Sequence, residues 1–227
     1  MESISELIGK ARAAQAEFEK TATQESVDAI VKAIAKVIYD NADPLAKMAA
    51  EESGMGVYED KINKNKGKAR VIWNFLKDKK SVGVINRDEK TCITEVARPM
   101  GVIAAITPCT NPIVTPMCNA MYAIKGRNAI IIAPHPRAKK CAKVVTDLFR
   151  KEIEKQGAPA DLVLLVEEPS TALSAELMSK CDVVVATGGM GMVKAAYSSG
   201  KPAYGVGAGN VQCIIDRGVN YAEAAPK

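Results

Sequence analysis

Histidine is nearly missing from this sequence: the chain of 227 residues contains His135 and no other. Its six cysteines include no C-x-x-C pair. Because a zinc site made from cysteine and histidine needs such pairs or several histidines, the sequence argues against one. One histidine also cannot act both as a catalytic base and as a metal ligand. These shortages disfavour most hydrolases and metalloenzymes, and we expect no bound metal.

Aromatic residues, long apolar runs and secretion signals are also scarce or missing. Aromatics make up 4% of the chain, so the core must be aliphatic. No apolar run approaches the roughly 20 residues that a membrane span requires, so no membrane partner is expected. The first ten residues lack a basic start followed by an apolar stretch, which argues against a secretory signal. We therefore expect a cytoplasmic protein with reduced thiols.

The charge pattern gives no sign of a nucleic-acid partner. The net charge is +5, and no Lys/Arg block is interleaved with aromatic residues. A mild positive excess suits small anionic ligands, but its usual meaning is only a solvated surface. With 48% hydrophobic and 25% charged residues, the chain has the balance of a soluble globular protein.

Helices are expected throughout the first 80 residues. Ser3 and Glu6 form a capping box before an apolar-periodic segment, which predicts the first helix. Apolar residues share one face over about residues 24–40, which predicts the second. We expect Asp43 to cap a third helix that ends at Gly54.

The next two segments differ in character. Residues 62–76 carry a helical apolar pattern among many lysines, and we interpret the lysine-rich face as solvated rather than ligand-binding. Residues 81–97 hold apolar residues on both sides of the polar turn 86–90, which predicts a β-hairpin or an extended arm.

Apolar strands and helices alternate regularly from Gly101 onward. Continuous Val/Ile runs that are separated by helices indicate a parallel sheet covered on both faces. We therefore predict an α/β fold: a doubly wound, Rossmann-like sheet with an N-terminal helical region at 1–80, a hairpin arm at 81–100 and a dinucleotide-binding domain at 101–227. The expected strands are 101–108, 128–134, 161–167, 181–189, the segment 203–209 and an apolar strand at 211–216; the expected helices are 111–125, 138–156, 170–180 and 192–198.

Four strand ends of this pattern carry Gly, Pro, Thr and Asn. They are the segments 107–112, 134–137, 187–189 and 205–210. Such residues are common in turns, so one loop of this kind would be weak evidence. Four on consecutive strands favour a ligand site, because a doubly wound fold binds nucleotides at the carboxyl ends of its strands.

The usual dinucleotide fingerprint is absent from the first strand of the sheet. Gly205, Gly207 and Gly209 have a similar spacing, but an apolar strand is expected after them instead of a helix. A conventional Rossmann dehydrogenase is therefore disfavoured.

Several long motifs in a fixed order resemble the aldehyde dehydrogenase superfamily, which binds its dinucleotide without that fingerprint. The motifs ESGMGVYEDK, TNP, GRNAIIIAPHPRA, ATGG-x-GMVKAAYSSGKPA and GVGAGN are similar to its CoA-acylating branch. The resemblance covers residues 5–216. Within that branch, VYEDK, VTPMCNAMYAIKGRN and KPAYGVGAGN look most like CoA-acylating succinate-semialdehyde dehydrogenases.

The resemblance implies an oxyanion role for Asn111. In the superfamily the asparagine at this position donates its side-chain amide to the oxyanion of the tetrahedral intermediate, and such a donor is worth about 2.7–4 kcal/mol. The alternative is a structural Asn-Pro turn before the following helix.

The resemblance also implies a nicotinamide cofactor. Hydrolytic members have Lys-Pro-Ser-Glu after the second strand, where this chain has His135-Pro136-Arg137-Ala138. The missing carboxylate would reduce repulsion of a ribose 2′-phosphate, so the choice between NAD and NADP stays open; His135 alternatively is a structural turn residue. The residues implied to contact the cofactor are Thr107, Pro108, Cys109, His135, Pro136, Arg137, Thr187, Gly188, Gly189, Val206 and Gly207.

One departure from the hydrolytic members points to CoA. Alignment of the glycines puts Val206 where those members have the glutamate that activates water. An acyl-enzyme without this base should survive until the thiol of CoA arrives. The expected reactants are a small-molecule aldehyde, CoA and NAD(P)+.

The nucleophilic cysteine of the family lies some tens of residues beyond GVGAGN, and none of the six cysteines occupies that motif. We therefore expect this chain alone to be inactive. A non-catalytic nucleotide-binding module that works with a separate catalytic chain is the alternative. The resemblance further implies a homo-oligomer formed through the arm. The first helix also resembles docking peptides of bacterial microcompartment enzymes, although packing on its own domain explains such a helix more often.

Overall fold

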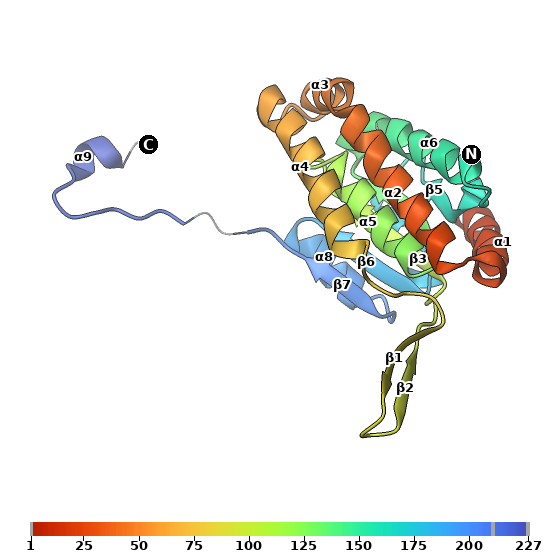
Figure 1. The fold of residues 1–227 in the computed structure, drawn as a ribbon. Helices are drawn as coiled ribbons and strands as arrows, with labels where there is room; N and C mark the ends of the chain where they lie inside the picture. Colours follow the sequence, from red (N-terminus) through yellow and green to blue (C-terminus); the bar gives the residue numbers. More distant parts are fainter. Residues whose placement is uncertain (1, 210–211, 226–227) are drawn as a thin grey trace.

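A five-stranded parallel sheet lies at the centre of the molecule, with helices on both faces and a separate hairpin below it (Figure 1). This computed structural model describes residues 2–209 and 212–225. The strands are β3 (Val102–Thr107), β4 (Ala129–Pro134), β5 (Val163–Leu165), β6 (Val183–Thr187) and β7 (Ala203–Val206). Their order, β5-β4-β3-β6-β7, reverses direction between β3 and β6, as in a doubly wound fold. The predicted fold class is confirmed.

The strands are short aliphatic runs because both faces of the sheet are covered. All six residues of β4 are buried. α5 (Val114–Lys125) and α6 (Lys139–Lys155) pack between this sheet and α2 (Gln24–Asp40). In contrast, α1 (Ile4–Thr21) and α7 (Thr171–Lys180) pack against each other and β3. α8 (Met190–Tyr197) contacts β6 and β7. Short 3-10 helices at Pro136–Ala138 (η1) and Ala160–Leu162 (η2) precede α6 and β5.

The first two helices follow their capping and periodicity signals closely. α1 (Ile4–Thr21) begins with the Ser3–Glu6 capping box, and α2 (Gln24–Asp40) has the predicted bounds. The apolar face of α1 is buried in the chain's own core, which supports packing rather than docking as its role. Buried residues of the helices and of the sheet form one hydrophobic cluster, and the division of the chain at residues 80 and 100 stays a prediction.

The prediction that Asp43 caps the third helix is wrong. α3 (Ala42–Ser53) begins directly after Asn41, which also ends α2. The Asn41 side chain donates to the carbonyl of Val37, so one residue closes one helix and opens the next. Asp43 instead lies in the first turn, where a negative charge is still favourable. Gly54 ends the helix with a φ of 64°, as expected.

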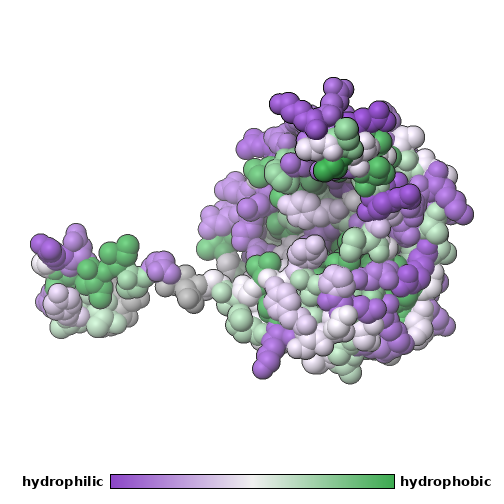
Figure 2. All heavy atoms as spheres, turned by 90° about the horizontal axis from the view of Figure 1, so that it is seen from below, coloured by the Kyte–Doolittle hydropathy of each residue, from purple (hydrophilic) through white to green (hydrophobic). Residues whose placement is uncertain are grey.

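The lysine-rich segment and the arm are both present. α4 (Tyr58–Leu76) packs on α2, α3 and α5. β1 (Val84–Asp88) and β2 (Ile93–Val96) pair in antiparallel fashion and project away from the sheet (Figure 1). Figure 2 views the molecule from below, the side on which the hairpin projects, and shows hydrophobic and hydrophilic atoms interspersed on this face.

The expected apolar strand at 211–216 is not formed by its described residues. Gln212–Asp216 have no regular structure, and Val211 lies outside the described residues. Ile214 is 91% exposed, and the tail that contains it and α9 (Tyr221–Ala224) lies away from the sheet and shows hydrophobic patches (Figures 1 and 2). A strand is stable only beside other strands of a sheet, and Gln212–Asp216 are not part of either sheet that the described residues form.

Candidate functional site

A cavity of about 870 Å³ opens at the carboxyl edge of the parallel sheet. It lies across the point between β3 and β6 at which the strand order reverses, which is where open α/β sheets bind ligands. All four predicted strand-end loops contribute to its wall, so they converge on one crevice. The lining residues from these loops are Thr107, Pro108, Cys109, Thr110, Asn111, Pro134, His135, Pro136, Thr187, Gly188, Gly189, Gly207, Ala208 and Gly209.

The loop after β3 places Asn111 at the cavity. α5 begins at Val114, three residues later than predicted, so Asn111 belongs to the loop and not to the helix. Thr107 ends β3 with its hydroxyl buried and without a hydrogen-bond partner in the described structure. The thiol of Cys109 lies 3.9 Å from the sulfur of Met55. This loop therefore offers the cavity an accessible amide, next to a buried hydroxyl without a partner.

The loop after β4 is held by a helix-capping network. The Nδ1 atom of His135 accepts a hydrogen bond from the backbone N–H of Arg137, at 3.1 Å, so this histidine caps η1. The Arg137 guanidinium turns away from the cavity and donates to the carbonyl of Ser53, at 2.7 Å. Of the two side chains, His135 lines the cavity and Arg137 does not.

Two glutamates lie near this loop, each bonded to a neighbouring lysine, one through the lysine side chain and one through the backbone. Lys139 forms an ion pair with Glu168 at 2.6 Å. The backbone N–H of Lys140 donates to the Glu52 carboxylate at 2.7 Å. Carboxylates therefore stand near this end of the sheet even though the local motif lacks one. A ribose 2′-phosphate at this end of the sheet would therefore still lie near negative charge.

The loop after β6 leaves a helix N-terminus open to the cavity. Gly189 precedes α8, and no side chain caps this end of the helix. A Cβ atom added to Gly189 would meet no atom within 4 Å, and one added to Gly188 would meet only Met192 at 3.8 Å. These glycines are not required by packing, and they leave space beside backbone N–H groups of a kind that binds phosphate.

At the end of β7, packing rather than ligand space explains the glycine at position 205. A Cβ on Gly205 would lie 2.7 Å from Val193 and 2.9 Å from Tyr197, so this glycine allows β7 to pack on α8. Gly207 lines the cavity, whereas Val206 is 58% exposed and does not. The last residue of the predicted motif, Asn210, lies outside the described residues.

A fifth strand end was missed by the sequence interpretation. The loop between β5 and α7 lines the same cavity through Pro169 and Ser170, and the first turn of α7 lines it through Thr171 and Ser174. Ser170 caps α7 by accepting the N–H of Leu173 at 3.2 Å. The signal was available, because Pro-Ser-Thr comes after an apolar strand here as Pro-Cys-Thr comes after β3.

A small recess on the other side of Asn111 was also missed. Its walls come from α3, α4 and the loop after β3, and Lys61, Lys64 and Asn111 are among them. The ammonium of Lys64 donates to the side-chain oxygen of Asn111 at 2.9 Å. Lys61 is buried, and burial, followed by the nearby charge of Lys64, lowers its pKa. The lysine-rich face is thus not wholly solvated as predicted.

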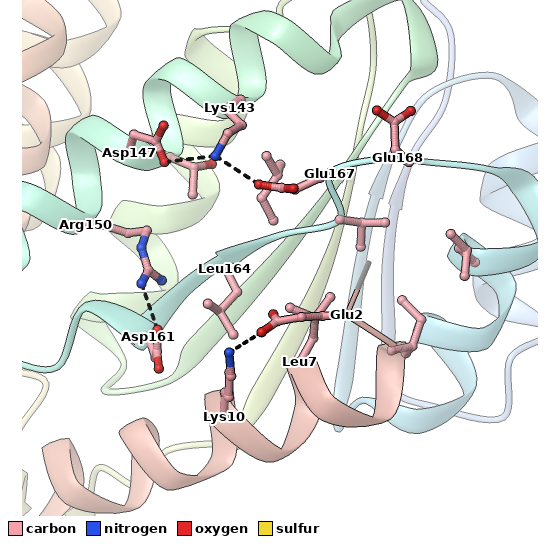
Figure 3. A pocket seen from close by; sticks show the side chains of 15 residues that line it. Glu2, Leu7, Lys10, Lys143, Asp147, Arg150, Asp161, Leu164, Glu167 and Glu168 are labelled. Atoms are coloured by element: carbon pink, nitrogen blue, oxygen red, sulfur yellow. Dashed lines mark hydrogen bonds and ion pairs between the residues drawn. The ribbon is translucent and has the colours of Figure 1, made fainter.

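A second cavity, of about 490 Å³, lies beside the edge strand β5 (Figure 3). The cations that line it are all in ion pairs: Lys10 with Glu2, Lys143 with Asp147 and Glu167, and Arg150 with Asp161. Arg150 also donates to the edge carbonyl of Val163 at 3.1 Å, which covers part of the open sheet edge. With its charges neutralised internally, this cavity is the weaker candidate for an anionic ligand.

The cysteine environments argue against a nucleophile among the buried thiols. Burial raises the pKa of Cys118 to about 11, and it also raises the pKa of Cys141 and of Cys181. A reactive cysteine needs a lowered pKa. The described residues contain no group of three or more His, Cys, Asp and Glu side chains suited to a metal. They also include no helix with the length and apolar character to cross a membrane.

Comparison with known proteins identifies the family. The aldehyde dehydrogenase family profile matches residues 1–226. The chain is 56% identical over 223 residues to a succinate-semialdehyde dehydrogenase (acetylating) from Clostridium kluyveri. The aligned region is 98% of this chain and 49% of that protein. It is 47% identical over 226 residues to a sulfoacetaldehyde dehydrogenase from Acholeplasma sp, and this aligned region is 99% of this chain and 46% of that protein.

Solved structures agree. An acetylating aldehyde dehydrogenase from Geobacillus thermoglucosidasius matches with a TM-score of 0.88 and 45% identity, over 92% of this chain and 46% of that one. A propionaldehyde dehydrogenase from Rhodopseudomonas palustris, solved with CoA and an acylated cysteine, has a TM-score of 0.78 and 32% identity, over 92% and 48%. An engineered glycolyl-CoA reductase with bound NADP+ has a TM-score of 0.80 and 32% identity, over 99% and 51%.

The chain belongs to the aldehyde dehydrogenase family, in its CoA-acylating branch. It spans about half the length of the relatives reported above.

Proposed function

We propose that this chain is the cofactor-binding part of an oxidoreductase that converts an aldehyde to its acyl-CoA with NAD(P)+ and CoA. The observation that carries the proposal is the convergence of all four predicted strand-end loops on one cavity at the switch point of the sheet. A volume of about 870 Å³ is in the range of cofactor sites.

The residues that line the cavity fit an extended dinucleotide. The uncapped N-terminus of α8, with open space at Gly188 and Gly189, suits a pyrophosphate. Thr107 also lines the cavity, and its buried hydroxyl has no hydrogen-bond partner among the described residues. When bound, NAD(P)+ supplies the acceptor for the hydride that leaves the aldehyde carbon.

Asn111 is proposed as the oxyanion donor for the tetrahedral intermediate. It lies at the mouth of the same cavity, and its amide nitrogen has no hydrogen bond among the described residues. The nucleophilic cysteine would come from the half of the relatives that this chain does not cover. We therefore propose that the isolated chain binds nucleotide but does not form thioester.

CoA as acyl acceptor rests on Val206. This apolar side chain cannot take a proton from water, so the proposed acyl-enzyme lacks the base that hydrolysis requires. Relatives solved with CoA support this choice of acceptor. The aldehyde itself is left open, because the reported relatives act on succinate semialdehyde and on sulfoacetaldehyde. We further propose a cytoplasmic homo-oligomer that contacts its partner through the β1–β2 arm; one relative comes from a bacterial microcompartment.

Calorimetric titration of the chain with NAD+, NADP+ and CoA tests the site. We expect saturable binding of at least one nicotinamide dinucleotide, with weaker binding after Gly188→Ala. An absence of binding by all three ligands would refute the proposal.

An assay with aldehyde, CoA and NAD(P)+ tests the division of labour. The isolated chain should produce no thioester, and addition of the catalytic half should restore its formation. Nucleotide binding without any restored activity would favour a non-catalytic module instead. Thioester formation by the chain alone would show that a nucleophile is already present.

A further inference from the structure

The side chain of Asn111 lies between two hollows of the structure, and its oxygen contacts Lys64. One side belongs to the large cavity, and the other belongs to the recess beneath α4. In the recess, the ammonium of Lys64 lies 2.9 Å from the side-chain oxygen of Asn111. The two residues are 47 positions apart in the chain, so the contact depends on the packing of α4 against the loop after β3.

We propose that Lys64 is a positioning residue for Asn111, a role that rests on the proposed function of Asn111 as oxyanion donor. A lysine ammonium has hydrogens to donate and no acceptor, so only the oxygen of the amide can face it. The amide nitrogen then remains as the donor available to the cavity. Without Lys64, the amide can rotate and present its oxygen to a developing negative charge.

The charge of Lys64 adds to this orientation. A cation that donates to an amide oxygen polarises the whole group and makes its N–H a stronger donor. It also brings positive charge close to the oxyanion position, in a site where water becomes scarcer once substrate binds. Both effects grow as negative charge develops, so they favour the transition state over the bound aldehyde.

The position of Lys64 on α4 is fixed by its neighbours. Asn65 is buried and donates to the carbonyl of Ala42 at 3.1 Å, which ties α4 to the start of α3. Lys61, one turn earlier, is buried on the same side. Lys64 therefore emerges from a helix that is anchored next to it, and it reaches Asn111 without a flexible backbone.

Steady-state kinetics of the holoenzyme, in which this sequence is combined with its catalytic half, test the proposal. Lys64→Met should lower kcat about 10- to 100-fold, the value of a charge-assisted hydrogen bond, with little change in the dissociation constant for NAD(P)+. Lys64→Arg should recover part of the rate because it keeps a donor. Lys68→Met, an exposed lysine on the same helix, is the matched control and should leave kcat unchanged.

A double-mutant cycle separates positioning from a merely structural tether. If Lys64 acts through Asn111, Lys64→Met should have almost no further effect in an Asn111→Ala background. Fully additive losses, or a change confined to cofactor affinity, would overturn the proposal.

A spectroscopic measurement keeps the two proposals apart. In ¹⁵N-labelled chain, the side-chain amide signals of Asn111, assigned by their loss in Asn111→Asp, should shift in Lys64→Met and not in Lys68→Met. Signals that stay in place would refute the contact itself. If the Asn111 amide signals do shift in Lys64→Met but the wild-type holoenzyme has no acylating activity, the contact exists and the proposed function is refuted. The catalytic role of the contact is then refuted with it.

Discussion

Glu52 at the end of α3 caps the first turn of α6 by accepting the backbone N–H of Cys141 at 2.7 Å, while its other carboxylate oxygen accepts the N–H of Lys140 at the same distance. The chain thus fills one helix N-terminus with its own carboxylate. The N-terminus of α8 has no such cap. We propose that an anionic ligand in the cavity binds at the uncapped α8 end, where Gly188 and Gly189 leave open space, rather than at the end of α6 that Glu52 fills.

Removal of this cap should destabilise the fold. Glu52→Ala deletes two charge-assisted hydrogen bonds and a favourable charge at a helix N-terminus, and we expect a loss of about 1–2 kcal/mol in the free energy of unfolding. Urea titration followed by circular dichroism measures it. Glu51→Ala removes an exposed carboxylate one position earlier and should change the stability little. Equal effects of the two substitutions would contradict the capping role.

The buried ion pair between Lys125 on α5 and Asp28 on α2 should matter more than exposed pairs on the same helix. Lys125 is 6% exposed at its side chain, and Asp28 is 23% exposed. Asp28→Asn leaves a buried ammonium without its counter-charge, which should cost about 2–4 kcal/mol. Asp40→Asn breaks the exposed pair with Lys36 and should cost less than about 1 kcal/mol. The prediction fails if urea titration gives the two variants the same midpoint.

Thiol alkylation should follow burial. Burial disfavours the thiolate and raises the pKa of Cys118 to about 11. Burial also raises the pKa of Cys141 and of Cys181. At pH 8 these three should stay protonated and unlabelled by iodoacetamide, whereas the exposed Cys92 and Cys213 react. Cys118 should begin to react only as the pH approaches its pKa. Mass spectrometry of proteolytic peptides before and after denaturation checks the pattern, and rapid native labelling of Cys141 would contradict it.

Cys109 gives a direct report on the cavity. It is partly exposed and lies in the cavity wall. Saturating NAD(P)+ should slow its alkylation while the rate at Cys92 on the distant hairpin stays constant. Equal rates at Cys109 with and without nucleotide would indicate that the dinucleotide binds elsewhere or not at all.

Local signals made most of the fold predictable. The Ser3–Glu6 capping box and the apolar face of residues 24–40 specify their helices without help from distant contacts. The strand-end loops were predictable for a similar reason, because parallel strands bring their carboxyl ends to one edge. At Asp43 two capping candidates compete, and the choice of Asn41 depends on how α2 ends.

The features of the site that the sequence did not predict arise from contacts that are distant in sequence. The turn of Arg137 toward Ser53 and the bond from Lys64 to Asn111 join residues 84 and 47 positions apart. No pattern within one segment encodes such a pairing. The predicted strand at 211–216 is absent from its described residues for another reason. The apolar pattern there favours a strand, but a strand also requires pairing within a sheet, and neither sheet of the described residues includes this segment.

Substitution by alanine should lower the stability at Gly205 and the dinucleotide affinity at Gly188. Gly205→Ala puts a methyl group 2.7 Å from Val193 and 2.9 Å from Tyr197, so β7 must shift from α8, at about 1–3 kcal/mol of unfolding free energy. Gly188→Ala meets only an ordinary contact at 3.8 Å, so its stability should stay within about 1 kcal/mol of the wild type. Its methyl group nevertheless occupies space beside the α8 N-terminus, and we expect about tenfold weaker dinucleotide binding by calorimetry, which corresponds to about 1.4 kcal/mol. Wild-type affinity in a normally folded Gly188→Ala variant would show that the phosphates do not approach this loop.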